Sequence, residues 1–211
     1  MERKVNPNNQ RGYLFIKRCI DVVGAVAGLL MLLIVFIIVS LLIKLEDPKG
    51  SIFFSQKRVG KNGKEFKMYK FRSMVSDAEA KLAELLEQNE TTGAMFKMKN
   101  DPRVTKIGKL IRKTSIDELP QLINVLKGDM SLVGPRPPIV REVNEYTGYQ
   151  MQRLLVTPGC TGLWQVSGRS NIGFEEMVEL DLTYITTRSL MADIKIIFRT
   201  ILMLFGSKNA F

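Results

Sequence analysis

An adjacent pair of carboxylates, Asp117 and Glu118, is the feature of this 211-residue sequence best suited to covalent chemistry. The chain contains no histidine, which excludes from it a Ser-His-Asp triad, an imidazole general base and a His-ligated zinc. A carboxylate is the obvious remaining nucleophile, and an Asp-Glu pair at the start of a helix can divide the work. One carboxylate would attack the substrate while the other holds Mg²⁺.

The same carboxylates also have a purely structural interpretation. Ser115, with Glu118 three residues later, matches the pattern of a helix capping box, and acidic residues in a first turn interact favourably with the helix dipole. Both interpretations are open on these residues alone. Nearby cations favour chemistry, because guanidinium and ammonium groups suit a phosphate-bearing substrate. These cations are Arg112, Lys70, Arg72, Arg103 and Arg136.

Short elements must position these side chains. In chain order, the sequence predicts strands at 51–56 and 65–71 around a turn at 60–63, a polar surface helix at 76–88, a loop at 89–106, and helices at 107–113, 116–127, 174–187 and 189–205. The Gly-Pro-Arg-Pro-Pro segment at 134–138 predicts a stiff extended loop, since proline restricts both itself and the residue before it. The glycine-rich segment 158–173 predicts a second irregular stretch.

The uncharged run 22–43 is long and apolar enough to form a membrane segment. A helix of this length reaches roughly 33 Å, which matches a hydrocarbon core of about 30 Å. Residues 1–72 carry 14 basic and 5 acidic side chains, so nearly all of the net charge of +10 flanks this run. Positive charge on both sides of an apolar segment favours anionic lipids as partners rather than nucleic acid.

Two topologies are open for this segment. Since both flanks are basic, a helix that enters the bilayer, bends and leaves by the same face obeys the positive-inside tendency. The alternative is an ordinary span with the short N-terminus forced across. A bend frees backbone groups in lipid, so we expect it near 33–36, with Ser40 or the closing helices satisfying those groups. Gly24 and Gly28 form a GxxxG pair that could bring another helix close, in a possible homodimer.

Four ordered motifs carry a family resemblance. They are Tyr-Lys-Phe-Arg-Ser-Met at 69–74, Ser-Ile-Asp-Glu-Leu-Pro-Gln-Leu at 115–122, Lys-Gly-Asp-Met-Ser-Leu-Val-Gly-Pro-Arg-Pro at 127–137, and Pro-Gly-Cys-Thr-Gly-Leu-Trp-Gln-Val-Ser-Gly-Arg at 158–169. Together they resemble the signature of the bacterial sugar transferases, the monotopic phosphoglycosyl transferases. The resemblance runs from about Phe15 to Phe205. No multi-span module precedes the motifs, so we expect the small form of the family.

The resemblance implies transfer of a sugar 1-phosphate from a UDP-sugar to a polyprenol phosphate, such as undecaprenyl phosphate, with release of UMP. By similarity, Asp117 would form an aspartyl phosphosugar, and Glu118, with Asp117, would bind Mg²⁺. This is the first membrane step of bacterial exopolysaccharide, capsule or O-antigen synthesis. The residues expected to bind substrate are Arg112, Lys70, Arg72, Arg136 and Arg169. A loop-locking salt bridge is an equal alternative for Arg136, and lipid headgroup contact is one for Lys70 and Arg72.

The expected fold is mixed α/β and mostly helical. It comprises an N-terminal tail (1–12), a re-entrant membrane helix (13–48) and a small cytoplasmic catalytic domain (49–211) at the bacterial inner membrane. The apolar face of 189–205 could pack in a soluble core or lie in the headgroup plane, and the presence of a membrane segment favours the second. The family's re-entrant helix usually has a Ser-Pro break, whereas the run 22–43 contains no proline. Cys160, where an aliphatic residue is usual, is expected to be a small buried hydrophobe.

A non-enzymatic membrane adaptor is the alternative function. Its basic flanks and amphipathic helices would dock it on anionic lipid, and the charge distribution fits both hypotheses. The adaptor leaves the Asp117-Glu118 pair and the loop 134–138 without a task, and it predicts no nucleotide turnover. No motif identifies the sugar.

Overall fold

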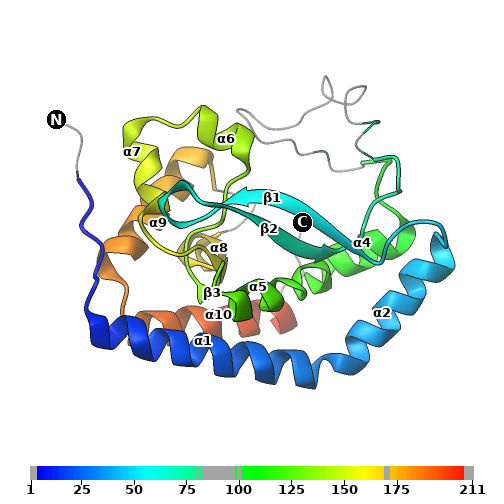
Figure 1. Cartoon of the computed structure of the whole chain (residues 1–211), viewed down its shortest axis with the longest axis horizontal. Coiled ribbons are helices and arrows are strands. Elements are labelled where there is room, and N and C mark those ends of the chain that lie inside the picture. The colour runs from blue at the N-terminus through cyan, green and yellow to red at the C-terminus, as the bar shows by residue number, and fades with distance from the viewer. Residues whose placement is uncertain (1–3, 79, 82–97, 99–100, 169–171, 207–211) are drawn as a thin grey trace.

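Helices predominate in the computed structural model, which describes residues 4–78, 80–81, 98, 101–168 and 172–206 (Figure 1). Two short two-stranded sheets accompany them, so the mixed α/β, mostly helical class is confirmed. The helices are α1 (Arg11–Met31), α2 (Leu33–Glu46), α4 (Lys106–Lys113), α5 (Gln121–Lys127), α6 (Val140–Asn144), α7 (Gly148–Met151), α8 (Leu163–Ser167), α9 (Phe174–Thr187) and α10 (Leu190–Gly206). The strands are β1 (Phe53–Val59), β2 (Glu65–Phe71), β3 (Ser131–Val133) and β4 (Gly159–Thr161), and the 3₁₀ helices are η1 (Lys61–Gly63), η3 (Ile116–Glu118) and η4 (Gln152–Leu155).

The apolar N-terminal segment forms two helices, α1 and α2, that meet at an angle of 59°. Among the described helices, none alone has the length and hydropathy to cross a bilayer, whereas this bent pair reaches both limits when taken together. The break lies at Leu32, whose ψ of 7° departs from the helical value of about −42°. The Ser40 hydroxyl donates to the Phe36 carbonyl at 2.6 Å, just beyond the break. The bend therefore forms without proline, one residue before the range expected.

The inner face of α1 packs along the rest of the molecule (Figure 1). Its buried residues recur every four positions, as they do on one face of a helix: Tyr13, Lys17, Asp21 and Ala25. A β-carbon at Gly24 would lie 2.7 Å from Leu132, and one at Gly28 would lie 3.0 Å from Leu122. The GxxxG pair therefore faces residues of its own chain, so it does not provide a surface for a second copy.

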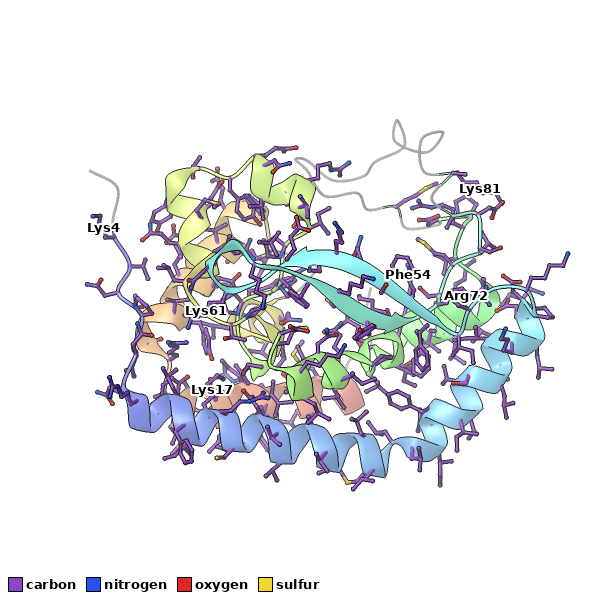
Figure 2. The ribbon with its side chains drawn as sticks, in the orientation of Figure 1. Lys4, Lys17, Phe54, Lys61, Arg72 and Lys81 are labelled. Carbon is purple, nitrogen blue, oxygen red and sulfur yellow. The ribbon has the colours of Figure 1, made fainter. Side chains whose placement is uncertain are left out.

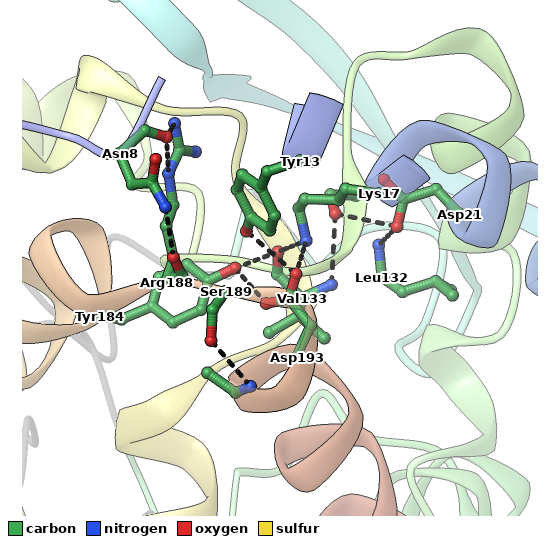
Figure 3. A network of polar contacts seen from close by, with 12 residues as sticks. Asn8, Tyr13, Lys17, Asp21, Leu132, Val133, Tyr184, Arg188, Ser189 and Asp193 are labelled. Carbon is green, nitrogen blue, oxygen red and sulfur yellow. Dashed lines mark hydrogen bonds and ion pairs between the residues drawn. The ribbon is translucent and has the colours of Figure 1, made fainter. Parts of the chain in front are cut away.

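A buried polar cluster joins α1 to α10 and β3 (Figure 3). Lys17 Nζ lies 2.9 Å from Asp193 Oδ2 and donates to the Val133 carbonyl at 3.0 Å. The hydroxyls of Tyr13 and Tyr184 donate to the same carboxylate at 3.0 and 2.7 Å. Every polar atom named here has a partner, which is the condition for a stable buried network. We call these four side chains the Lys17 cluster.

Both ends of the α1–α2 pair attach to the same folded body. Before α1, the Val5 N–H donates to Gln152 Oε1 at 2.6 Å, and Arg188 donates to the Asn8 carbonyl at 2.8 Å. After α2, Asp47 pairs with Arg72 at 2.7 Å, and Figure 2 shows Arg72 beside the end of α2. The segments that flank the bent pair therefore lie against one domain.

The hairpin of β1 and β2 follows α2. Its antiparallel register pairs Phe53 with Phe71 and Val59 with Glu65. The prediction for β2 is confirmed residue for residue, whereas β1 begins two residues later than predicted and ends three later. The intervening turn contains Asn62 at φ 57° and Gly63 at φ 79°, a left-handed pair that reverses the chain.

A parallel pair of three-residue strands, β3 and β4, lies beside the loop 134–138. The sequence predicted neither strand, and 158–173 was expected to be irregular, but it contains β4 and the helix α8. The backbones of Gly134 and Gly159 approach so closely that a β-carbon at Gly159 would lie 2.0 Å from the Gly134 nitrogen. Glycine is therefore required at this crossing.

The remaining helices follow the prediction with local differences. α9 has its predicted bounds, α10 begins and ends one residue later, and α4 begins one residue earlier. The predicted helix 116–127 is divided into η3 and α5, with Pro120 at the boundary. Most of the predicted surface helix 76–88 and of the loop 89–106 lies outside the described residues. The short elements α6, α7 and η4 had no counterpart in the prediction.

Candidate active site

The carboxylates of η3 face Lys70 near the end of β2. Lys70 Nζ donates to Glu118 Oε1 at 2.7 Å and lies 3.9 Å from Asp117 Oδ2. The Lys70 side chain is 22% exposed, so this ion pair is partly shielded from water. The hairpin and η3 thus bring together three of the residues expected to do chemistry, and a single ammonium group serves both carboxylates.

Asp117 is buried, with 7% of its surface exposed. Burial raises its pKa to about 6, and the neighbouring negative charge of Glu118 adds to this, while Lys70 and Arg112 act in the opposite direction. At neutral pH Asp117 is still mostly ionised. A carboxylate with a raised pKa is more basic than an exposed one, which favours nucleophilic attack.

Glu118 responds to the same surroundings in the opposite sense. Burial alone would raise its pKa, but the charge and hydrogen bond of Lys70, together with Arg136 and Arg58, outweigh burial and lower it. Its side chain is 40% exposed, in contrast to that of Asp117. Two adjacent carboxylates whose pKa values are shifted apart are typical of sites where the two carry different roles.

The capping-box interpretation of this segment is wrong. Ser115 makes no side-chain hydrogen bond at the start of η3 and has left-handed backbone angles, φ 55° and ψ 17°. Glu118 bonds to Lys70 instead of returning to the backbone of Ser115. A left-handed conformation costs a serine roughly 1–2 kcal/mol, and such strain is concentrated at functional sites.

Arg112 lies beside the carboxylates at the end of α4. Its Nε donates to Ser73 Oγ at 2.9 Å, which fixes the guanidinium. Burial lowers the pKa of Arg112, while the charges of Asp117 and Asp101 raise it. Arg103 is held in an ion pair with Asp101 at 2.6 Å. Of the two arginines, Arg112 is therefore the one that the structure places near Asp117.

The loop 134–138, which carries Arg136, is held along its backbone. Four of its carbonyls accept hydrogen bonds. The Gly159 N–H donates to Pro135 at 2.9 Å and the Val59 N–H donates to Pro138 at 2.9 Å. The side chains of Arg153 and Arg58 donate to Arg136 at 3.4 Å and to Pro137 at 2.9 Å, respectively. As predicted, residues 134–138 form neither a helix nor a strand, but the chain bends at residues 134 and 135. The main-chain carbonyls of residues 135–138 therefore contribute to holding the loop in place.

A cavity of about 200 Å³ opens beside Lys70 and Glu118. Its wall includes Arg136 and also Arg58, one of the basic residues that follow the apolar run 22–43. Burial lowers the pKa of Arg58 to about 10, and the adjacent charge of Arg136 acts in the same direction. Three cations around one cavity suit a diphosphate. In the sequence, Arg58 is an arginine near the end of a predicted hairpin strand. This pattern is common at protein surfaces, so it did not mark Arg58 as a cavity residue.

Among the described residues expected in the site, Asp117, Arg112 and Arg72 do not line this cavity. Arg72 is 8% exposed and bonds to both the carboxylate and the carbonyl of Asp47, at 2.7 and 2.9 Å. Its guanidinium links the end of α2 to β2. Arg169 lies outside the described residues. Cys160, by contrast, lines the cavity while packing beside a small apolar cluster that contains Met68 and Val125, and burial raises the pKa of its thiol.

Comparison with known proteins gives a consistent result. The model of the bacterial sugar transferase family matches residues 12–207. Similar curated proteins include the galactosyl transferase CpsE of Streptococcus agalactiae, 55% identical over 190 residues, and the undecaprenyl-phosphate galactose phosphotransferase of Salmonella typhimurium, 44% identical over 197 residues. The exopolysaccharide production protein ExoY of Rhizobium meliloti is 42% identical over 189 residues.

These matches differ in how much of each relative they cover. They include 90%, 90% and 88% of this chain, but 42%, 40% and 83% of the three relatives, respectively. The chain therefore spans about two fifths of the length of the first two. The family model covers nearly all of the chain, including the Asp117-Glu118 pair and the loop 134–138. The chain belongs to the bacterial sugar transferase family.

Proposed function

We propose that this protein transfers a sugar 1-phosphate from a UDP-sugar to a polyprenol phosphate and releases UMP. The observation that carries the proposal is the buried Asp117, with its raised pKa, held beside Lys70, Glu118 and a cavity lined by cations. Relatives are named for the undecaprenyl-phosphate transfer of galactose and of N-acetylgalactosamine. Those names support the acceptor class and make these two sugars the first donors to test.

The chemistry divides into two displacements. An oxygen of Asp117 attacks the sugar-bearing phosphorus, the bond from that phosphorus to the bridging oxygen breaks, and UMP leaves with the electron pair. A phosphate oxygen of the polyprenol phosphate then attacks the same phosphorus, and the Asp117 carboxylate leaves. Lys70, Arg58 and Arg136 offset the phosphate charge during both steps, and Arg112 orients the nucleophile or a phosphate oxygen.

The donor set fits a Mg²⁺ ion shared with the substrate. Mg²⁺ is commonly held by one or two carboxylates together with substrate phosphates and water. Within the described part of the chain, no group of three or more acidic or cysteine side chains forms a self-sufficient metal site. Glu118, with Asp117 beside it, would hold the ion, which when bound supplies further neutralisation of the diphosphate charge.

We also propose that α1 and α2 enter and leave the inner membrane by its cytoplasmic face. Support comes from the contacts of Asn8 and Asp47, since the segments on both sides of the pair pack on one domain. Apolar side chains on the outer faces of α1, α2 and α10 would contact lipid. The exposed ones include Phe15, Val23, Leu30, Met31, Ile34, Leu41, Leu45, Met191, Ile194, Phe198 and Leu202.

Cysteine labelling in intact cells tests this topology. In a Cys19→Ser, Cys160→Ser background, single cysteines at the exposed positions Asn6 and Lys61 are both expected to be protected from an impermeant reagent. Asn6 is preferable to Asn8, which is bonded to Arg188. Both positions should label equally after lysis. Labelling of Asn6 from outside, with Lys61 protected, would mean that the segment spans the bilayer.

The nucleotide product tests the function. With Mg²⁺, polyprenol phosphate and UDP-galactose or UDP-N-acetylgalactosamine, we expect one UMP for each sugar transferred, measured by chromatography of the nucleotides. An ordinary glycosyltransferase would break the sugar–phosphate bond and leave UDP. Stoichiometric UDP would therefore contradict the proposal. A folded, membrane-bound protein that releases no nucleotide from any UDP-sugar would instead favour a lipid-binding adaptor.

A further inference from the structure

Two uncharged polar side chains form part of the cavity wall. Trp164 and Gln165, both on α8, line the cavity together with Arg58 and Arg136. The Trp164 indole N–H and Gln165 Oε1 are buried, and none of the described residues forms a hydrogen bond with either atom. A buried polar atom without a partner costs roughly 1–3 kcal/mol, so native proteins keep few of them. Two neighbouring examples on one cavity wall suggest that a ligand supplies the partners.

Local contacts position the Gln165 amide and the start of α8. The Gln165 Nε2 donates to the Cys160 carbonyl at 3.3 Å, which leaves Oε1 as the unpaired end of the amide. Gly162, which precedes α8, packs so tightly that a β-carbon there would lie 2.4 Å from the Gly134 carbonyl oxygen. The start of α8 is thus held against the strand end that leads to Arg136. The Gln165 amide and the start of α8 are therefore positioned before any ligand binds, which lowers the entropic cost of recognition.

The chemistry of the pair identifies the ligand class. An indole N–H only donates and an amide oxygen only accepts, whereas a hydroxyl does both. A polyhydroxylated ring with neighbouring hydroxyls satisfies both groups at once. The cations on the same cavity suit the attached phosphates. We propose that Trp164 and Gln165 form the sugar subsite, in which they bind hydroxyl groups of the hexose of the UDP-sugar.

This inference rests on the proposed function and specifies where the sugar lies. In the proposed reaction the sugar phosphate stays on Asp117 while UMP departs. Lys70 and Glu118 line the same cavity as Trp164 and Gln165. Lys70 lies 3.9 Å from Asp117, and Glu118 follows Asp117 in the chain. A walled cavity next to the nucleophile suits the group that is retained. The uracil, which leaves, is therefore the less suitable occupant.

Binding measurements can separate the sugar from the uridine. The full-length chain in detergent, carrying Asp117→Asn to prevent turnover, is titrated with UDP-galactose, UDP-N-acetylgalactosamine and sugar-free UDP in Mg²⁺ buffer. Trp164→Phe removes the N–H while keeping an aromatic ring, and Gln165→Met removes the amide while keeping the length of the side chain. Each is expected to weaken binding of the better UDP-sugar about tenfold and to leave UDP binding unchanged.

A matched control lies on the same helix. Ser167 is exposed and bonds only within α8, to the Leu163 carbonyl, among the described contacts. Ser167→Ala is expected to leave all three affinities unchanged, and thermal melting checks that each variant is folded. Two different variants guard against one of them failing to fold.

Parallel loss of UDP and UDP-sugar affinity would place the uridine at this wall and overturn the inference. Unchanged affinity for both ligands would overturn it as well, as would a parent protein that binds UDP-sugars no better than UDP. The proposed function has a separate readout, because it fails on release of UDP instead of UMP by the unsubstituted protein. A sugar-specific loss of affinity would still establish the subsite in that case.

Discussion

The Asp117→Asn protein is expected to form no covalent product with a UDP-sugar labelled in its sugar, and to lose at least about 10³-fold in turnover. An amide nitrogen or oxygen does not replace a carboxylate as nucleophile, and loss of a nucleophile is among the most damaging of active-site changes. Denaturing electrophoresis of the labelled protein and the UMP assay measure the two effects. Glu175→Gln, an exposed carboxylate on α9, is the matched control and should label normally.

The stability of the same variant distinguishes a nucleophile from a capping residue. Because the folded pKa of Asp117, about 6, lies above its unfolded value, ionised Asp117 destabilises the fold at pH 7.5. A neutral asparagine should therefore stabilise the protein there, by on the order of 1–3 kcal/mol. This gain should shrink as the pH falls through 6 and disappear below about 4, as urea unfolding would measure. A capping aspartate would instead lose about 1 kcal/mol.

The pH dependence of covalent labelling follows from the same group. Labelling by the unsubstituted protein should fall about tenfold for each pH unit below 6, as Asp117 becomes protonated.

Glu118→Gln should cut the rate severely and weaken its dependence on Mg²⁺, because one of the two carboxylates for the ion is lost. Near-normal turnover by folded Asp117→Asn would contradict the assignment of the nucleophile.

Elements with a strong local signal were predictable from the sequence. The strand Glu65–Phe71 and the helix Phe174–Thr187 have the predicted bounds, because each carries its own pattern of propensity. The stiff loop 134–138 followed from its prolines. β3 and β4 were missed because each has three residues, and pairing with a partner 28 positions away defines them. Strands that depend on such long-range pairing are poorly predicted from local sequence.

The sequence predicted the carboxylates of the candidate site, but only some of its cations. Asp117, Glu118 and Lys70 were expected together, and the structure places them in contact. Arg72 and Arg58 carry similar signals, since both are arginines at strand ends in a basic stretch. Only the tertiary structure shows that Asp47 holds Arg72, whereas Arg58 reaches the cavity. The left-handed Ser115 was also beyond local rules, because serine seldom adopts this conformation without support from its surroundings.

The Lys17 cluster links the proposed membrane segment to the candidate site. Lys17 of α1 and Asp193 of α10 have side chains that are only 10% and 7% exposed. The Val133 carbonyl, which accepts from Lys17, immediately precedes the loop that carries Arg136. Asp21, one turn further along α1, accepts from the Leu132 N–H at 2.8 Å. The helix proposed to enter the membrane therefore fixes β3 directly.

Lys17→Met is accordingly expected to destabilise the protein by about 3–5 kcal/mol, because it leaves the Asp193 carboxylate buried without its cation. Thermal melting in detergent measures the loss, and sugar transfer should fall with it as β3 loosens. The double variant Lys17→Met, Asp193→Leu should recover part of the stability, since neither charge then remains. Lys57→Met is the control, because its pair with Glu65 is exposed and contributes no more than about 1 kcal/mol. If Lys17→Met costs no more than Lys57→Met, the cluster does not join the proposed membrane segment to the site, and α1 must be held by its other contacts, such as the hydrogen bond of Asp21.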